Sequence, residues 1–320
     1  MSNDFKPLQG MTDISNPDIF QWQKIEQIAH SVLTNFGYSE LRTPILEKSD
    51  VFIHSLGNAS DIVLKEMYNL EDRGGRSLVL RPEGTAGAIR FLASLGEEAY
   101  NNKIYYMGPM FRCERPQAGR KRQFHQIGVE SINNPNPYID AECIALQYEM
   151  LKKWGIENAT IKINTLGSTD DQKNIREGLY SSLKKEIHNF PEDYQKRIKE
   201  NVLRVLDWNN EEFKQIIDNL PSILTFMSDD SRQYLESVIK TLNDLDIPVE
   251  HDSRLVRGLD YYNHTVWEII HTSLGSQNSI AGGGRYTIQI GRKEMNGVGF
   301  AMGIERVISV LQNSKKIQIN

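Results

Sequence analysis

Hydrophobic positions in the first forty residues follow the spacing of an α-helix. Asn16-Pro17-Asp18 is typical of a helix start, and apolar residues then recur every three or four positions. The series comprises Phe20, Ile25, Ile28, Ala29, Val32, Leu33 and Phe36. Gly37 is a typical stop signal just after the last of them. The pattern predicts an amphipathic helix that leads into an extended segment ending near Pro44.

Short apolar runs between polar loops predict a sheet. The expected strands are Ser77–Leu80, Lys103–Arg112, Gln123–Ile132, Thr160–Leu166, Arg254–Tyr262, Thr265–His271, Ile280–Tyr286 and Gly297–Gly303. Helices are expected over Asp140–Trp154 and from Ile304 to about Gln312. Because strands connected by hairpin-like turns lie next to helices, we predict an α+β fold with an antiparallel sheet flanked by helices.

The composition changes between about Ser168 and Leu245. This stretch is rich in Lys, Glu, Asp and Asn, contains almost no glycine and has helical periodicity. We therefore predict a helical insertion subdomain at residues 168–245. Residues 1–167 and 246–320 would then form one core.

Charge and cysteine content narrow the class of protein. The net charge is −5 and the pI is near 5.9, so any nucleic-acid contact requires a local basic patch. Two cysteines, Cys113 and Cys143, predict neither a disulfide framework nor a cysteine zinc site, and favour a reduced, cytoplasmic setting. The first residues do not have the pattern of a signal peptide, and no apolar run approaches 18 residues, so we expect no membrane span.

The segment from Tyr105 to Glu130 carries the strongest chemical signal. Cationic residues crowd the connection between its two strands: Arg112, Arg115, Arg120, Lys121 and Arg122. On the returning strand, Phe124, Gln126 and Glu130 share one face. Arginines can neutralise phosphates and an aromatic ring can stack on adenine, so the segment predicts an ATP site. The alternative is a solvent-exposed charged hairpin.

Four further segments are candidates, each with a plainer alternative. In LRPEGTAGAIR, Glu83 beside Thr85 could bind an ammonium group, or the segment could be a strand-to-helix turn with Thr85 near the helix cap. In RLVRGLDYYNHTVWEI, Arg257 precedes Tyr261 and Tyr262, which could form a site or a surface turn. The glycines of AGGGRY and of GVGFAMGIER indicate close approach of a ligand or a neighbouring element. Arg306 ends the last segment.

Taken in order, these segments resemble the motifs of class II aminoacyl-tRNA synthetases. FRCER with the following loop and RQFHQ is similar to motif 2, GVGFAMGIER to motif 3, and GYSELRTPILE to motif 1. LRPEGTAG, RGLDYY and AGGGRY together resemble the histidyl-tRNA synthetases. The resemblance extends from Gly10 to about Leu311.

This resemblance implies an activity and a set of partners. The chain is expected to activate L-histidine with ATP and Mg²⁺ and to pass it to the acceptor end of tRNA(His). It is also expected to form a homodimer, partly through motif 1, in the cytoplasm. Fixed arginines suit this chemistry because attack on the α-phosphorus shifts charge onto phosphoryl oxygens.

The resemblance also implies roles for individual residues. Arg112 would bind the ATP α-phosphate and the histidine carboxylate. For the rest of ATP, Glu114 would bind the adenine amino group, Phe124 the base, Arg306 the γ-phosphate, and Arg120 and Arg122 phosphates or the tRNA end. For histidine, Glu83, Thr85 and Gln126 would hold the ammonium group, and Glu130 and Tyr262 the imidazole, with Tyr261 close by. Arg257 would be a second cation at the α-phosphate, beside the substrate carboxylate. Arg112 and Arg257 are thus the expected catalytic pair.

The sequence departs from the family at two places. After Tyr286 it reads TIQIGRKEMN, a few residues shorter than usual, and Cys113 stands where many members have histidine. The family normally continues into an α/β anticodon-binding domain, which this chain does not include.

Two alternatives therefore stay open. The first is the histidine-binding regulatory subunit of ATP phosphoribosyltransferase, and the second is a histidine-activating paralogue with another acceptor. The presence of Arg112, Arg257 and Arg306 favours an activating enzyme, because the regulatory relatives tend to lose these arginines.

Overall fold

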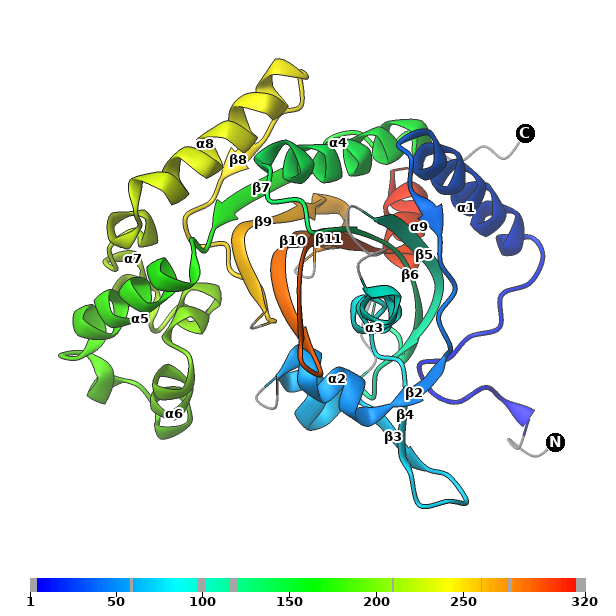
Figure 1. Cartoon of the computed structure of the whole chain (residues 1–320), viewed down its shortest axis with the longest axis horizontal. Coiled ribbons are helices and arrows are strands. Elements are labelled where there is room, and N and C mark those ends of the chain that lie inside the picture. Colours follow the sequence, from blue (N-terminus) through cyan, green and yellow to red (C-terminus); the bar gives the residue numbers. More distant parts are fainter. Residues whose placement is uncertain are drawn as a thin grey trace.

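The computed structural model describes residues 5–57, 60–96, 102–115, 120–208, 210–259, 261–275 and 278–314. Among these residues, eight strands form one large sheet, which curves through the middle of the molecule (Figure 1). In sheet order they are β1 (Ser39–Glu40), β5 (Lys103–Phe111), β6 (Gln123–Ile132), β11 (Lys293–Gly303), β10 (Ser279–Ile290), β9 (Tyr262–Ile270), β7 (Thr160–Thr165) and β8 (Glu250–His251).

The six central strands pair antiparallel throughout, from β5 to β7. Only the short edge strands are parallel to their neighbours: β1 pairs with β5, and β8 with β7. The predicted α+β class with a largely antiparallel sheet is confirmed. Most predicted strand positions are confirmed to within a few residues.

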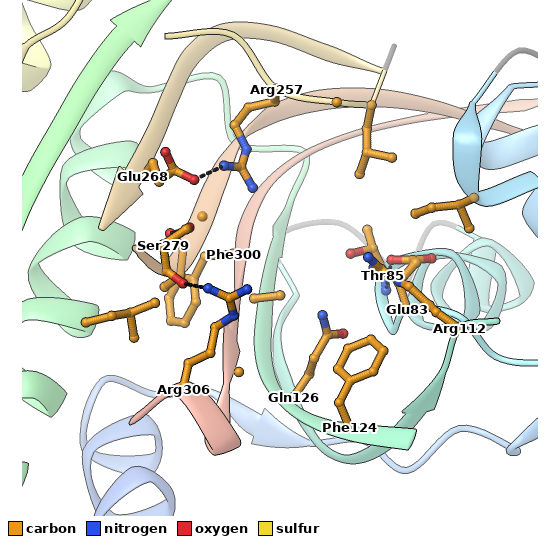
Figure 2. Close-up of a pocket in the computed structure, with 18 of the residues that line it drawn as sticks. Glu83, Thr85, Arg112, Phe124, Gln126, Arg257, Glu268, Ser279, Phe300 and Arg306 are labelled. Atoms are coloured by element: carbon orange, nitrogen blue, oxygen red, sulfur yellow. Dashed lines mark hydrogen bonds and ion pairs between the residues drawn. The ribbon is translucent and has the colours of Figure 1, made fainter. Parts of the chain in front are cut away.

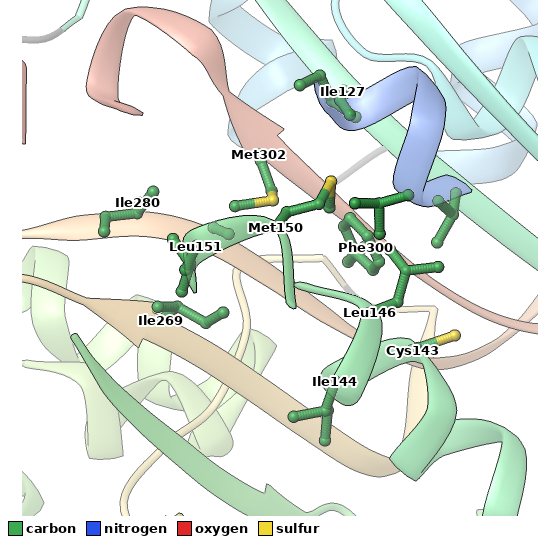
Figure 3. Close-up of a cluster of buried hydrophobic side chains, with 14 of the residues drawn as sticks. Ile127, Cys143, Ile144, Leu146, Met150, Leu151, Ile269, Ile280, Phe300 and Met302 are labelled. Atoms are coloured by element: carbon green, nitrogen blue, oxygen red, sulfur yellow. The ribbon is translucent and has the colours of Figure 1, made fainter. Parts of the chain in front are cut away.

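Helices cover the outer face of the curved sheet. These are α1 (Asp18–Asn35), α4 (Pro137–Trp154) and α9 (Ile304–Asn313). Helix α1 contacts α4 and α9, α4 contacts β11, and α9 contacts β6, β10 and β11. The core between them contains Ile144 and Met150 of α4 packed near Phe300 of β11 (Figure 3). The apolar stripe predicted for the first helix faces this core, with Ile25 and Leu33 buried.

The inner face of the sheet holds α3 (Thr85–Leu95), which lies inside the curve in Figure 1. Beside it are α2 (Ser49–Leu56), a π-helical turn at Ile62–Glu66 and a smaller sheet. Within the described residues that smaller sheet has three strands, in the order β2 (Leu46–Lys48), β4 (Ser77–Leu80) and β3 (Tyr68–Glu71). The N-terminus of α3 therefore points residues 83–85 toward the main sheet, where the site forms.

Helices and turns occupy the predicted insertion, with no strand among its described residues. The helices are α5 (Thr169–Leu183), α6 (Glu192–Glu200), α7 (Lys214–Asp218) and α8 (Asp229–Asp244), joined by 3₁₀ turns at Ile187–Asn189, Val202–Asp207 and Ile223–Phe226. The last helix, α8, packs on α4 of the core, whereas α5, α6 and α7 project to one side (Figure 1). The division into core and insertion remains a prediction.

One buried carboxylate joins the two ends of this helical segment. Asp171, in the first turn of α5, accepts hydrogen bonds from the backbone of Ser168 and Ser228 and from the hydroxyl groups of both. The hydroxyl of Ser231 adds a further bond of 2.5 Å. Ser168 and Ser228 are the N-caps of α5 and α8, so Asp171 fastens the two helix starts together.

Two expectations need correction. Arg254–Tyr262 was expected to be a strand, but the described residues before Tyr262 form turns and bends. Asp252 explains the difference, because its carboxylate and carbonyl accept from the backbone of Arg254 and Leu255 and bend the chain. The strand predicted to end at Tyr286 is longer than expected: β10 and β11 continue pairing to Ile290 and Lys293, joined by two residues.

Candidate active site

A cavity of about 720 Å³ opens on the inner face of the sheet. Of the thirteen site residues predicted from the sequence, twelve line it, and they come from separate parts of the chain. These are Glu83, Thr85, Arg112, Glu114, Arg120, Phe124, Gln126, Glu130, Arg257, Tyr261, Tyr262 and Arg306. Figure 2 shows Arg112 on one side of this space, with Arg257 and Arg306 on the other.

Arg122 is the exception, because it is not part of the cavity lining. Its guanidinium donates to the backbone carbonyl of Glu114, and its own backbone pairs with Arg112 and Gly10. Arg122 thus supports the strand ends that carry Arg112 and Glu114. Residues 116–119, in the connection between the two strands, lie outside the described residues.

Strand β6 presents the predicted face to the cavity. Phe124, Gln126 and Glu130 all line it, as the alternation of side chains along a strand requires. The guanidinium carbon of Arg112 lies 5.2 Å from the centre of the Phe124 ring, and its Nε donates to the carbonyl of Pro82 across 2.9 Å. The Oε1 atom of Gln126 is buried and accepts no hydrogen bond from any described residue. It is therefore available to a donor on a ligand.

Glu83 is both a cavity residue and a helix cap. Its carboxylate accepts from the backbone amides of Thr85 and Ala86, at 2.7 and 2.8 Å, at the start of α3. Burial raises the pKa of Glu83, and the two amide hydrogen bonds oppose that rise. The capping alternative is thus confirmed. It leaves a fixed, buried carboxylate facing the cavity.

Glu130 lies at the buried end of the cavity, between two phenols that the sequence analysis did not select. Tyr286 donates to its Oε2 across 2.6 Å and Tyr106 to its Oε1 across 3.2 Å. Burial raises the pKa of Glu130 to about 8, although the phenols favour the ionised form. Tyr286 was visible in AGGGRY, but Tyr106 precedes the loop and carried no signal of its own.

The ring of Tyr106 occupies space that two glycines leave open. A Cβ added to Gly84 would lie 2.0 Å from this ring, and one added to Gly128 would lie 2.3 Å from it. The first glycine precedes α3 and the second lies in β6. The tyrosine is therefore enclosed by backbone on two sides, which fixes its hydroxyl beside Glu130.

Arg257 enters the cavity from the irregular segment before β9. Its Nη1 donates to Oε1 of Glu268 across 3.0 Å, whereas its Nε is buried without a described partner. Tyr261 and Tyr262 line the cavity nearby, with ring centres 4.7 Å apart. Glu268 lies in TVWEI, after the predicted residues, and was missed because nothing local marks it as a partner of Arg257.

Arg306 lies in the first turn of α9, and its Nη1 donates to the carbonyl of Ser279 across 2.5 Å. The preceding residue, Glu305, accepts from the backbone amide of His125 at 2.9 Å and from its ring at 3.1 Å. This contact fastens the start of α9 to β6. Arg306 and Phe124 are consequently held at a fixed separation across the cavity.

Carboxyl groups outnumber cations around the cavity. The acidic lining residues that the structure describes are Asp61, Glu66, Glu83, Glu114, Glu130, Asp207, Glu268 and Glu305, and the cationic ones are Arg112, Arg120, Lys121, Arg257 and Arg306. The acids exceed the bases in number, even when Glu130, whose pKa is about 8, is left out as mostly uncharged at neutral pH. An anionic ligand with several phosphates would need additional positive charge to bind here.

Comparisons with known proteins fit this geometry. Residues 10–307 match the histidyl-tRNA synthetase family. The histidine–tRNA ligase of Bacillus subtilis (strain 168) is 44% identical over 316 residues, which cover 96% of this chain and 74% of that protein. The chain belongs to the histidyl-tRNA synthetase family. It is accordingly a class II aminoacyl-tRNA synthetase by fold and motif.

Solved structures of related proteins have the same architecture. The apo S. aureus histidyl-tRNA synthetase has a TM-score of 0.79 and 33% identity, and covers 99% of this chain and 76% of its own. A Bacillus halodurans protein, described as an ATP phosphoribosyltransferase regulatory subunit/histidyl-tRNA synthetase, has a TM-score of 0.71 at 22% identity. It covers 97% of this chain and 84% of its own, and this likeness shows the shared fold alone.

Proposed function

We propose that this histidyl-tRNA synthetase family member activates L-histidine with ATP and transfers it to tRNA(His), as a histidine–tRNA ligase. The observation that carries the proposal is the convergence of Arg112, Arg257 and Arg306 on one cavity. They come from the end of β5, the segment before β9 and the start of α9. That cavity also contains a buried carboxylate held by two tyrosines.

In the first step, the histidine carboxylate attacks the α-phosphorus of ATP. A new P–O bond forms, the bond to the bridging oxygen of pyrophosphate breaks, and pyrophosphate leaves with that electron pair. No protein nucleophile takes part. Arg112 and Arg257 hold the carboxylate and the α-phosphate together and stabilise the charge that grows on the phosphoryl oxygens. Arg306 binds the γ-phosphate.

The adenine ring stacks on Phe124, opposite the guanidinium of Arg112, and its amino group donates to Glu114. Arg112 is ready for this role because Pro82 and the Phe124 ring already hold its guanidinium. Glu114 is in turn held by Arg120 at 3.1 Å. Little reorganisation is needed when ATP enters, which favours catalysis.

Histidine selection depends on paired polar groups. Glu83, Thr85 and Gln126 hold the ammonium group, and the free Oε1 of Gln126 gains a partner when histidine binds. Glu130 and Tyr262 contact the imidazole, with Tyr261 adjacent. An amino acid without such a ring could not pair with the polar groups that are placed for an imidazole, and sites of this kind discriminate by about 10⁴-fold or more.

Magnesium ions fit the charge of this cavity. In the described part of the chain, no cluster of three or more metal-ligating side chains is present, so the ions would arrive with ATP. The excess of acidic residues around the cavity favours a nucleotide that carries them. Bound to the phosphates, magnesium would supply positive charge for the leaving pyrophosphate.

For the second step, the acceptor end of tRNA(His) approaches past the motif 2 residues Arg120, which is exposed, and Lys121, which is half-buried. These residues line the cavity at its cationic edge. Since the whole chain is acidic, this contact is local, and we expect charging to weaken as salt rises.

We also assign the protein to the cytoplasm, in keeping with its free Cys113 and Cys143. Among the described helices, none is long and apolar enough to cross a membrane.

We further propose that the protein forms a homodimer, with an interface on the smaller sheet and the adjoining part of motif 1. Ile45, Leu46 and Leu70 are exposed there, on β2, β3 and the adjoining segment. Exposed apolar side chains gathered on one surface are typical of protein interfaces. Sedimentation equilibrium tests this: we expect a dimer, and Leu46→Asp with Leu70→Asp should shift the protein toward monomer.

The decisive test is histidine-dependent exchange between pyrophosphate and ATP, with magnesium present. We expect exchange with histidine but not with other amino acids, and then charging of tRNA(His). Histidine binding without exchange would instead support the regulatory role of the ATP phosphoribosyltransferase subunit. Exchange without charging would support an activating enzyme with another acceptor.

A further inference from the structure

The arginine at the reacting centre lies on a part of the chain that has no regular structure. Residues 252–259 form turns and bends between β8 and β9. A long side chain on such a segment has many rotamers, yet catalysis requires a guanidinium held within a fraction of an ångström. Something other than the local backbone must therefore fix Arg257.

The sheet beneath Arg257 supplies a matching slot. On neighbouring strands, Gly282 of β10 and Glu268 of β9 are directly opposite each other. A Cβ added to Gly282 would lie 2.3 Å from Nη2 of Arg257 and 2.5 Å from its Cζ. The guanidinium thus lies against the bare backbone of β10, in space that any other residue at 282 would occupy.

Glu268 forms the wall of this slot. Its carboxylate accepts from Nη1 of Arg257 across 3.0 Å, and Figure 2 shows the two side chains facing each other at the edge of the cavity. The Glu268 side chain thus makes a direct hydrogen bond to the guanidinium that it faces. The pair is partly exposed, with 24% of each side chain accessible. A structural role in the core would have buried it.

A second carboxyl group near Arg257 offers its guanidinium another possible partner. Asp207, at the end of the 3₁₀ turn Val202–Asp207, also lines the cavity. Partial burial and the nearby Glu268 raise the pKa of Asp207, and Arg257 opposes that rise, so the three groups influence one another. Without Glu268, the guanidinium would turn toward Asp207 or toward water.

We propose that Glu268 is the positioning residue for Arg257, holding its guanidinium against Gly282 where the α-phosphate of ATP reacts. The inference rests on the proposed function, since it assigns Arg257 to histidine activation. Glu268 does not itself touch the substrate. It acts by holding the guanidinium of Arg257 in one direction, through a hydrogen bond to its own carboxylate.

Three variants test this by histidine-dependent pyrophosphate exchange. Glu268→Ala should lower kcat by roughly 10- to 100-fold while the KM for histidine changes less than about two-fold. The reason is that the contacts that bind histidine in the ground state are unchanged. Glu268→Gln keeps an acceptor and should lose less. Gly282→Ala should lose at least as much as Glu268→Ala, because its methyl group displaces the guanidinium. The matched control is Glu294→Gln, an exposed carboxyl on β11 outside the site, which should behave as wild type.

A double-mutant cycle separates positioning from general damage. If Glu268 acts through Arg257, then adding Glu268→Ala to Arg257→Ala should cause no further loss. Unchanged kcat in Glu268→Ala, or losses that multiply in the double variant, would overturn the inference. If the proposed function itself were wrong, the wild-type protein would show no histidine-dependent exchange.

Discussion

The hydroxyl of Tyr286 reaches over β11 to donate to Oε2 of Glu130, across 2.6 Å. Tyr286 belongs to β10 and Glu130 to β6, on either side of β11. Two glycines of β11 make the contact possible. A Cβ on Gly297 would lie 2.6 Å from the Tyr286 hydroxyl, and one on Gly299 would lie 2.2 Å from Oε2 of Glu130. The glycine spacing of motif 3 is thus explained by the side chains that cross over it.

Removing that hydroxyl should weaken histidine recognition. In Tyr286→Phe, Glu130 loses its closer donor, and leaving a buried acceptor unsatisfied costs about 1–3 kcal/mol. We expect the KM for histidine in pyrophosphate exchange to rise about ten-fold or more, with little change in the KM for ATP. Tyr138→Phe, at an exposed tyrosine of α4, is the control. An unchanged KM for histidine would separate Glu130 from substrate selection.

Glu130 should make stability fall as pH rises. Its pKa is about 8 in the folded protein, against an ordinary value of 4.5. Below pH 4.5 the group is protonated in both states. Between these values the unfolded state ionises first, so the free energy of unfolding falls by up to about 1.4 kcal/mol per pH unit.

Glu130→Gln should remove this dependence. Urea unfolding of the ligand-free protein between pH 5 and pH 8 measures the effect. We expect the variant to gain stability relative to wild type as pH increases, even though its histidine activation is impaired. A constant difference between the two proteins across this range would show that Glu130 does not titrate there.

Loss of Arg257 should damage the chemical step more than substrate binding. In Arg257→Ala, one of two cations at the α-phosphate is missing, and removal of one transition-state donor typically costs about 10²- to 10³-fold in kcat. Histidine affinity, measured by calorimetry without ATP, should stay within a few-fold of wild type. Arg254→Ala, at an exposed arginine paired with Asp218, is the control. Normal exchange in Arg257→Ala would remove this residue from the mechanism.

The carboxylate that joins α5 to α8 should matter for stability. Asp171→Ala removes an acceptor shared by two helix N-caps, so we expect a loss of about 3 kcal/mol in the free energy of unfolding. Asp170→Ala, an exposed neighbour, should cost far less. A difference below about 1 kcal/mol between the two variants would contradict this role.

The same residue gives an acid signature. Although burial raises the pKa of Asp171, hydrogen bonds from Ser231, Ser228 and Ser168 lower it below its ordinary value of 3.8. Its contribution is therefore present above pH 3.8 and is lost as pH falls toward the folded pKa. The stability gap between wild type and Asp171→Ala should stay constant from pH 8 to pH 5 and narrow only below about pH 4.

Sequence reasoning succeeded where the relevant relationship is local. Strand alternation is enough to bring Phe124, Gln126 and Glu130 to one face, and the motif order is enough to group the arginines. It failed where a partner depends on the register of distant strands. Glu268 faces Arg257 only because β9 and β10 align it with Gly282, and no spacing in the sequence contains that alignment.

Local side-chain chemistry accounts for the other difference. The apolar positions of Arg254–Tyr262 suggested a strand, but Asp252 bends the backbone at its start. The extended hairpin of β10 and β11 was likewise hidden. It forms because Gly291, at a φ of 62°, allows a two-residue connection, and Lys293 then donates to the carbonyl of Ala93 at the end of α3.

The enclosure of Tyr106 between Gly84 and Gly128 restricts how this site can change over generations. A side chain at either glycine requires a smaller residue at 106 first, and a smaller residue removes a donor from Glu130. Each single step from the present combination therefore either overlaps with the Tyr106 ring or removes its hydrogen bond to Glu130. We expect the three positions to vary together or not at all in descendants of this protein, whatever drift affects the surface around them.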